Sequence, residues 1–246
     1  KRYTILVNIA YNYHLTGDIR RAEELYIEAV AGLRTDSNPG FLLRALPGYA
    51  ELLRQTGRPE QAILMLEEVA GLMRSHNIRR GLPGILVALI SLYGLTALDK
   101  ISVLIEEALL LCREFRDRRN EMRVQNILAG MAIQQERDND TGLHLYRALQ
   151  LQNEINTPRL LPALLLNVTY LFLTVSATEE ATRLLAYTDA FMRTLEVDFM
   201  TMAGPIYVNC LERLKVCVAP EKFEQLWSEG EVMTPAAIHV LIRSTL

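Results

Sequence analysis

The sequence predicts an all-α fold, built as a stack of five to six helical hairpins. Two apolar stripes in residues 3–33 repeat at i, i+3, i+4 and i+7, the spacing that places side chains on one face of an α-helix. A glycine–aspartate pair separates the two stripes. The same stripe–break–stripe arrangement returns about every 40 residues along the chain. Such a period indicates an array in which each hairpin buries its apolar side against its neighbours.

The first hairpin carries its small and large residues in a particular order. Ala10 lies in the first stripe, Gly17 breaks the helix, and Ala22, Tyr26 and Ala29 follow in the second stripe. This order resembles that of a tetratricopeptide (TPR) repeat, whose signature places small and large side chains at these positions. The resemblance implies a right-handed α-α superhelix, in which small residues let the two helices of a hairpin cross closely.

The breaks between helices set the length of the repeat. They fall at Gly17 and Gly57 and near Thr96, Glu136 and Ser176, which gives intervals of 40, 39, 40 and 40 residues. TPR repeats usually have about 34 residues, whereas HEAT and armadillo repeats have roughly 40–47. The glycine–aspartate turn followed by alanine at a fixed offset favours the TPR interpretation, and the extra residues would then lengthen the helices or the loops.

This period predicts one solenoid domain over residues 1–246. We expect the chain to be a piece of a longer protein, because its first residues already lie inside a helical pattern. The expected hairpins cover residues 3–34, 41–76, 82–116, 121–154, 159–196 and 200–229, and a capping helix covers 234–244.

The C-terminal end carries a short motif, WSEGEVMT at 227–234. We expect Gly230 to stop one helix, and Thr234 to cap the next helix with Pro235 at its first position. The motif resembles the C-terminus of the TPR regions in large bacterial signal-transduction ATPases, including the maltose-activator-like LuxR-type transcriptional regulators. Pro235 and Ile238 depart from the acidic or alanine-rich helix start usual there. The resemblance implies a nucleotide-binding switch upstream and a superhelix that senses an inducer or a protein partner.

Composition excludes several classes of function. The 246 residues carry a formal net charge of -3, which argues against a surface that neutralises nucleic-acid phosphates. Cys112, Cys210 and Cys217 lack CxxC spacing, which argues against a zinc site or a disulfide framework and favours a reducing, cytoplasmic location. Cys210 and Cys217 lie seven residues apart, and we expect both to be buried thiols on one helix face.

Two uncharged stretches, 81–98 and 160–178, approach the length of a transmembrane helix. Prolines interrupt both of them, and glycine or polar residues interrupt them further. Each also falls where the repeat pattern places a helix followed by a turn. We therefore interpret them as central helices of the stack, buried by neighbours on both sides.

No pattern of an enzyme is present in the sequence. It contains no phosphate-binding loop, no HExxH motif and no nucleophile elbow, and its four histidines are scattered. We therefore expect no catalytic residues, no cofactor and no metal in this segment. Adjacent residues point about 100° apart on a helix, so we assign the glutamate doublets to solvated outer faces rather than to acid–base pairs. The doublets begin at Glu23, Glu67, Glu106 and Glu179.

The candidate binding surface is the inner, concave wall that the first helix of each hairpin lines in a TPR superhelix. Apolar first helices in the third and fifth hairpins predict a groove with an apolar middle and polar ends, suited to an amphipathic peptide, a protein or a small effector. Tight curvature that buries these residues against the next hairpin is the alternative. The residues predicted to line the groove are Tyr11, Arg44, Arg54, Leu86, Ile90, Tyr93, Arg123, Asn126, Asn167 and Tyr170.

Two functions follow from this sequence. The first is a non-catalytic ligand-sensing or protein-interaction domain of a multidomain bacterial regulator, with the other domains of the parent chain among its partners. The second is a stand-alone TPR scaffold that assembles proteins. A phosphate-binding loop upstream of residue 1 would distinguish the first from the second.

Overall fold

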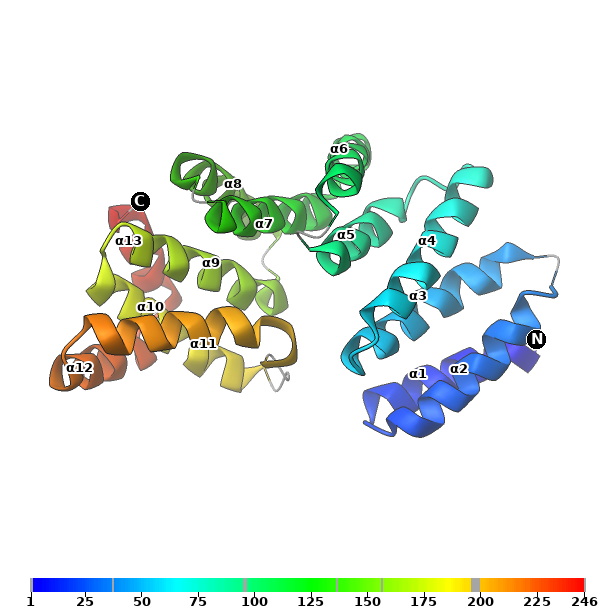
Figure 1. The fold of residues 1–246 in the computed structure, drawn as a ribbon, viewed down its shortest axis with the longest axis horizontal. Helices are drawn as coiled ribbons and strands as arrows, with labels where there is room; N and C mark the ends of the chain where they lie inside the picture. The colour runs from blue at the N-terminus through cyan, green and yellow to red at the C-terminus, as the bar shows by residue number, and fades with distance from the viewer. Residues whose placement is uncertain are drawn as a thin grey trace. The chain divides into compact units, whose positions relative to one another are not determined.

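The computed structural model describes residues 2–36, 38–94, 97–135, 137–155, 157–195 and 200–245. Within these ranges the chain forms thirteen α-helices and one short 3-10 helix, and no strand (Figure 1). The all-α class predicted from the sequence is therefore confirmed. The breaks expected near Thr96 and Glu136, and the end of the fifth expected hairpin at 196, lie outside the described residues.

The helices divide between two compact units, Lys1–Asn120 and Glu121–Leu246. The first unit contains α1 (Arg2–Leu15), α2 (Ile19–Leu33), α3 (Pro39–Gln55), α4 (Pro59–Ser75), α5 (Leu82–Tyr93) and α6 (Leu98–Phe115). The second unit contains most of α7 (Arg118–Gln134), and α8 (Asp138–Ile155), the 3-10 helix Pro158–Leu160, α9 (Leu161–Thr174), α10 (Thr178–Thr194), α11 (Met200–Cys217), α12 (Pro220–Glu231) and α13 (Pro235–Thr245). That the hairpins form a single solenoid domain stays a prediction.

The turns at Gly17 and Gly57 have the same geometry. Both glycines adopt a left-handed conformation, with φ of 83° and 74°. After Gly17, the N–H of Asp18 donates to the carbonyl of Tyr13 at 3.0 Å, and after Gly57 the next N–H donates to the carbonyl of Leu53 at 2.9 Å. This bond reaches back five residues and satisfies a carbonyl that the ending helix leaves unpaired. Glycine suits the turn because it lacks the Cβ atom that strains a positive φ.

Three later turns use the same left-handed conformation without glycine. Asn77, Arg116 and Ser176 have φ of 53°, 54° and 61°. At the last of them, the N–H of Ala177 donates to the carbonyl of Phe172 at 2.8 Å, as in the glycine turns. The Ser176 turn joins α9 to α10 and lies where the sequence predicts a break.

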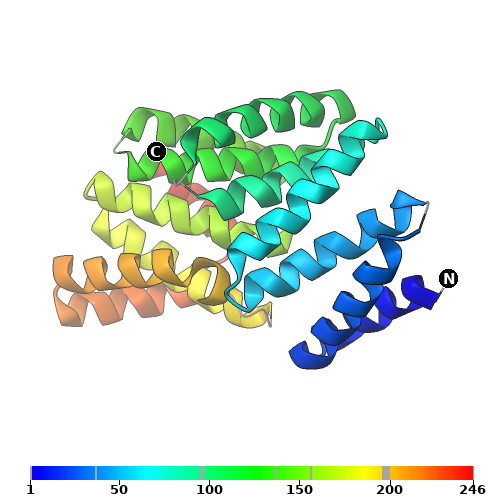
Figure 2. The same ribbon diagram turned by 45° about the vertical axis from the view of Figure 1, so that its right-hand side comes forward.

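In the first unit each helix packs on the next one along the chain, from α1 to α6, and α1 also packs on α3. Figure 2 shows the two blue helices, α1 and α2, beside the lighter blue α3. Ala10, Ala22, Tyr26 and Leu52 form a buried cluster between α1, α2 and α3. The ring of Tyr26 stacks on that of Tyr49, with centroids 5.6 Å apart. The small residues of the first hairpin therefore bring its helices together around one aromatic ring.

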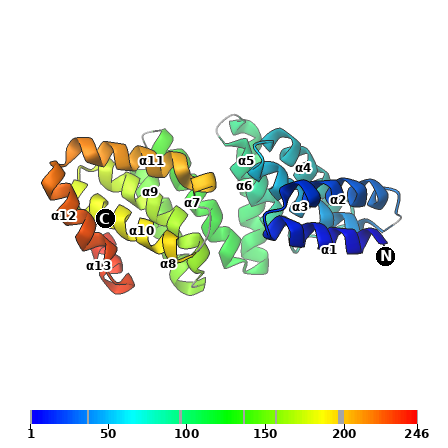
Figure 3. The same ribbon diagram turned by 90° about the horizontal axis from the view of Figure 1, so that it is seen from below.

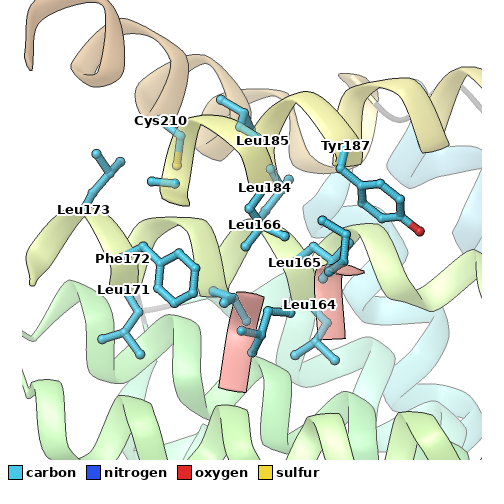
Figure 4. Close-up of a cluster of buried hydrophobic side chains, with 14 of the residues drawn as sticks. Leu164, Leu165, Leu166, Leu171, Phe172, Leu173, Leu184, Leu185, Tyr187 and Cys210 are labelled. Carbon is cyan, nitrogen blue, oxygen red and sulfur yellow. The ribbon is translucent and has the colours of Figure 1, made fainter. Parts of the chain in front are cut away.

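In the second unit α9 and α10 form the centre of the core (Figure 4). α9 packs on α8, α10 and α11, whereas α10 packs on α9, α11, α12 and α13 (Figure 3). Leu164, Leu165, Leu166 and Phe172 of α9 are all buried. Neighbours on several sides therefore explain why 160–178 is so apolar. Among the described residues, no helix combines the length and apolar character needed to cross a membrane.

The end of α12 differs in part from the sequence expectation. Gly230 is the last residue but one of α12, which ends at Glu231, so the helix ends one residue later than expected. A Cβ atom at Gly230 would overlap the carbonyl oxygen of Arg183 and lie 2.8 Å from the Cβ of Ala186. Glycine is therefore needed for the close approach of α12 to α10. The cap of the last helix is confirmed, because the Thr234 hydroxyl accepts from the N–H of Ala237 at 3.2 Å and Pro235 begins α13.

Candidate functional site

A groove of about 510 Å³ lies between α4, α5 and α6 in the first unit. Most of its lining is contributed by one face of α4 and one face of α6, and α5 adds two side chains. The lining residues are Glu67, Ala70, Gly71, Arg74, Leu89, Tyr93, Asp99, Lys100, Val103 and Leu104.

The helical period explains why these residues meet. On α4 the lining positions 67, 70, 71 and 74 follow the i, i+3, i+4, i+7 spacing and therefore share one face. On α5 the buried Leu89 and the half-buried Tyr93 are four residues apart and lie one turn from each other. The walls are thus apolar in the middle, and the polar groups come from residues at the ends.

Gly71 contributes no side chain to the α4 wall of the groove. A Cβ atom at this position would meet nothing within 4 Å. At Gly32 of α2, by contrast, a Cβ atom would overlap the ring of Tyr3. Glycine inside a helix costs about 0.5–1 kcal/mol relative to alanine. At Gly71 that cost leaves a space that a side chain would otherwise enter.

One end of the groove carries Glu67, Tyr93 and Lys100. The Tyr93 hydroxyl donates to the carboxylate of Glu67. The Lys100 ammonium lies 4.0 Å from the same carboxylate and 5.4 Å from the centroid of the Tyr93 ring. Burial, followed by the bond to Glu67, raises the pKa of Tyr93 to about 12.

The other end carries a second ion pair of opposite orientation. The Arg74 guanidinium donates to both carboxylate oxygens of Glu107, at 3.1 and 2.5 Å. Arg74 follows Glu67 by seven residues on α4, and Glu107 follows Lys100 by seven residues on α6. Seven residues make two helical turns, or about 10 Å. Each end of the groove therefore carries one ion pair between α4 and α6. At one end α4 supplies the negative charge and α6 the positive one, and at the other end the charges are reversed.

The same bridge recurs one hairpin earlier. Arg34, the C-cap residue of α2, donates to both oxygens of Glu68 on α4, at 3.2 and 2.5 Å. The expectation that the glutamate doublets lie on solvated faces is wrong for Glu68, Glu107 and Glu23, since these side chains are half-buried in ion pairs. A signal was present in the sequence, because Arg34 and Arg74 are 40 residues apart and Glu68 and Glu107 are 39 apart.

Among the ten residues predicted to line a groove, Tyr93 lines this one. Leu86 and Ile90 lie on the same helix but are 0% and 1% exposed, so at these positions the buried alternative is correct. A helix packed on two neighbours buries more of its surface than the sequence period alone indicates, and this accounts for the difference. The positions that open the groove, above all Gly71 on α4, were missed because they lie on second helices of the expected hairpins.

The predicted residues of the first two hairpins do not gather at this groove. Tyr11 and Arg44 are exposed on α1 and α3. Arg54 donates to Glu51 on its own helix, at 2.9 and 2.7 Å. Gln55 extends this cluster, since its amide donates to Glu51 and its carbonyl oxygen lies 2.8 Å from Nε2 of His14. The cluster therefore ties the end of α3 to the end of α1.

In the second unit, by contrast, two of the predicted residues, Asn126 and Asn167, meet. The Asn167 amide donates to the side-chain oxygen of Asn126 at 2.8 Å and to its carbonyl at 3.0 Å, linking α9 to α7. The guanidinium of Arg213 on α11 lies 5.0 Å from the centroid of the Tyr170 ring on α9. Arg123, one turn before Asn126, is half-buried. Asn167 itself is buried, so its role in the structure is to join two helices.

The cysteines follow the sequence expectation only in part. Cys112 and Cys210 are buried, but Cys217 is exposed at the end of α11, so the expectation that both cysteines of α11 are buried is wrong for Cys217. Burial raises the pKa of the Cys210 thiol to about 12. In the part of the chain that the structure describes, no three histidine, cysteine or acidic side chains gather as metal ligands.

No protein-family model matches the chain, and no curated protein is significantly similar to it in sequence. The similarity to TPR regions of bacterial regulators therefore rests on the residues quoted above, and it stays a prediction.

Proposed function

We propose that this chain is a non-catalytic, TPR-like binding domain of a multidomain bacterial regulator, and that the groove between α4, α5 and α6 holds a small organic effector. The observation that carries the proposal is the open space beside Gly71 within an apolar groove. The repeat period and the C-terminal motif support the assignment to a cytoplasmic regulator.

The size and chemistry of the groove suit a small molecule. Its volume of about 510 Å³ lies within the range of roughly 300–1,000 Å³ that is typical of small-ligand sites. Ala70, Val103 and Leu104 supply an apolar surface for the body of the effector. The lining charges of Glu67, Asp99, Arg74 and Lys100 cancel, so an uncharged body of about 10 Å with polar groups at its ends fits better than a polyanion.

A small aromatic probe tests this site. Anilinonaphthalene sulfonate is titrated into the protein, and the methyl resonances of Val103 and Leu104 are followed by NMR. We expect these resonances to shift on binding. We also expect Gly71→Leu to lower the affinity for the probe about tenfold, because the new side chain would enter the groove.

Gly142 provides a matched control. It also lies inside a helix, α8, and a Cβ atom there meets nothing within 4 Å, but it lies outside the groove. Gly142→Leu should bind the probe as the wild type does. Equal binding by the two variants, or probe-induced shifts only at methyl groups outside the groove, would contradict the proposed site.

The alternative function is a stand-alone scaffold for protein assembly. Exposed apolar side chains on the same two helices favour it, since Leu64 of α4 and Val103 and Leu110 of α6 extend the apolar surface. A parent gene without an upstream phosphate-binding loop, together with a purified partner whose affinity falls on Leu110→Asp and is unchanged by Gly71→Leu, would favour the scaffold over the sensor.

A further inference from the structure

We infer that the outer face of α1, formed by Ile5, Asn8, Ile9 and Asn12, is the docking surface for one more helical hairpin, supplied by the residues that precede α1 in the parent chain. This inference does not depend on the groove. It rests on a comparison between α1 and α3, which occupy equivalent places in successive hairpins.

The equivalence of α1 and α3 is shown by their ends. Gly17 and Gly57, 40 residues apart, make the same left-handed turn with the same backbone hydrogen bonds. Ala10 and Ala50, at the same distance before these turns, are both buried. Each residue of α1 can therefore be compared with the residue 40 positions later in α3.

In α3 the equivalent face packs on the preceding hairpin. Ala45 and Leu52 are both 0% exposed. Tyr49 stacks on Tyr26 of α2, and the hydroxyl of Tyr26 lies so close to Gly48 that a Cβ atom there would be 2.6 Å away. Helices α1 and α2 pack on α3 (Figure 3), and the contacts of Gly48, Tyr49 and Leu52 show that they cover this face.

The same face of α1 has no such cover within the described residues. Ile5, at the position of Ala45, is 58% exposed, and Ile9, at the position of Tyr49, is 39% exposed. Of the two asparagines on this face, Asn12 bonds within its own helix, because its side-chain amide donates to the backbone carbonyl of Asn8 at 3.0 Å. The first helix of a terminal hairpin is expected to carry a polar outer face instead of two isoleucines.

The interface between the first two hairpins also predicts which residues the additional hairpin should carry. Tyr26 fills the face of α3, so an aromatic residue is expected 40 positions before Tyr26. Arg34 bridges to Glu68, and Glu28 is the equivalent of Glu68 in α2. The side chain of Glu28 is 46% exposed, and one of its oxygens lies 2.6 Å from the Arg2 guanidinium. A basic residue is therefore expected 40 positions before Arg34.

The experiment compares this chain with one that begins about 50 residues earlier in the parent gene, by hydrogen exchange of the α1 amides. We expect α1 in the longer chain to exchange at least about tenfold more slowly. Ile5→Asp combined with Ile9→Asp should abolish this gain. The same double substitution in the shorter chain should leave α1 exchange within about twofold, because the two side chains are already exposed there.

Leu143→Asp serves as the control, since Leu143 is an equally exposed apolar residue on α8. It should leave the protection of α1 unchanged in both chains. Equal α1 exchange in the longer and shorter chains would overturn the inference. A parent gene that lacks the aromatic and basic residues at the stated positions would overturn it as well.

Discussion

Asn167 on α9 and Asn126 on α7 form a polar link within the second unit, in which one amide nitrogen bonds to both the side-chain and the backbone oxygen of its partner, at 2.8 and 3.0 Å. Asn167 is buried, and it lies beside Gly130, where a Cβ atom would be in ordinary contact with its amide nitrogen at 3.7 Å. Helix α9 is otherwise largely apolar, so this amide specifies which face of α9 meets α7.

Asn167→Ala should destabilise the protein by about 1–3 kcal/mol, because both hydrogen bonds are lost and the carbonyl of Asn126 is left without this donor. Asn126→Ala should cost less, about 0.5–1.5 kcal/mol, since Asn167 keeps the backbone acceptor. Urea denaturation of the full chain measures both. Equal costs for the two variants would contradict the assignment of two separate bonds.

Gly71 and Gly230 should respond to alanine in opposite directions. Gly71→Ala should stabilise by about 0.5–1 kcal/mol, because the new methyl group meets open space and the helix gains propensity. Gly230→Ala should destabilise by about 1–3 kcal/mol, because the methyl group would overlap the backbone of Arg183. Thermal and urea unfolding check the two signs. A stable Gly230→Ala protein would show that α12 can move away from α10 at little cost.

The ion pair between Arg58 and Glu23 predicts a pH dependence. The guanidinium donates to both carboxylate oxygens, at 2.5 and 2.8 Å, and these hydrogen bonds hold the pKa of Glu23 below its usual value of 4.5. A lowered pKa in the folded state contributes stability above pH 4.5, and this contribution is lost as the pH falls through the folded-state pKa.

Glu23→Gln should therefore cost about 1 kcal/mol at pH 7, where the pair is intact but partly screened by solvent. The difference from the wild type should shrink as the pH falls below 4.5. Urea midpoints of both proteins between pH 3 and 7 measure it, with Glu60→Gln on exposed α4 surface as the control. A difference that is constant with pH would contradict the pair.

Ser176 is a site where glycine should stabilise the protein. Its φ of 61° lies in the left-handed region, which costs a non-glycine residue roughly 1–2 kcal/mol. Ser176→Gly should recover about 1 kcal/mol of this, reduced by the greater freedom of glycine in the unfolded chain. Ser176→Val should instead destabilise. Thermal unfolding of both variants tests the prediction, and a loss of stability in Ser176→Gly would count against this turn geometry.

Part of the fold could be predicted from local sequence pattern, and the turns show how much of it. Gly17 and Gly57 were predicted as breaks, and each adopts the left-handed conformation for which glycine is suited. The break near Ser176 was predicted from the period alone, since serine gives no signal for a positive φ. Gly230 was predicted to end a helix, and α12 ends one residue later, but nothing in the sequence indicated its contact with Arg183, a residue 47 positions away.

The residues of the groove could be predicted from the sequence pattern only in part. Tyr93 was predicted because it lies on an apolar first helix, and it does line the groove. Leu86 and Ile90 share that helix but are buried, since periodicity gives the direction of a side chain and leaves open what covers it. Gly71 could not be predicted to line the groove, because from sequence alone a glycine within a helical pattern indicates only a weaker helix. The space beside it depends on how the neighbouring helices pack.

The sequence by itself determined the helical class and the breaks at Gly17, Gly57 and Ser176, because apolar spacing and turn conformations act over a few residues. The tertiary structure alone decided which of those residues are covered. Ala45 is buried whereas Ile5 is exposed, although the two residues occupy equivalent positions in successive hairpins. The difference depends on which helices pack against each position, and such contacts join residues too far apart for any local pattern to record.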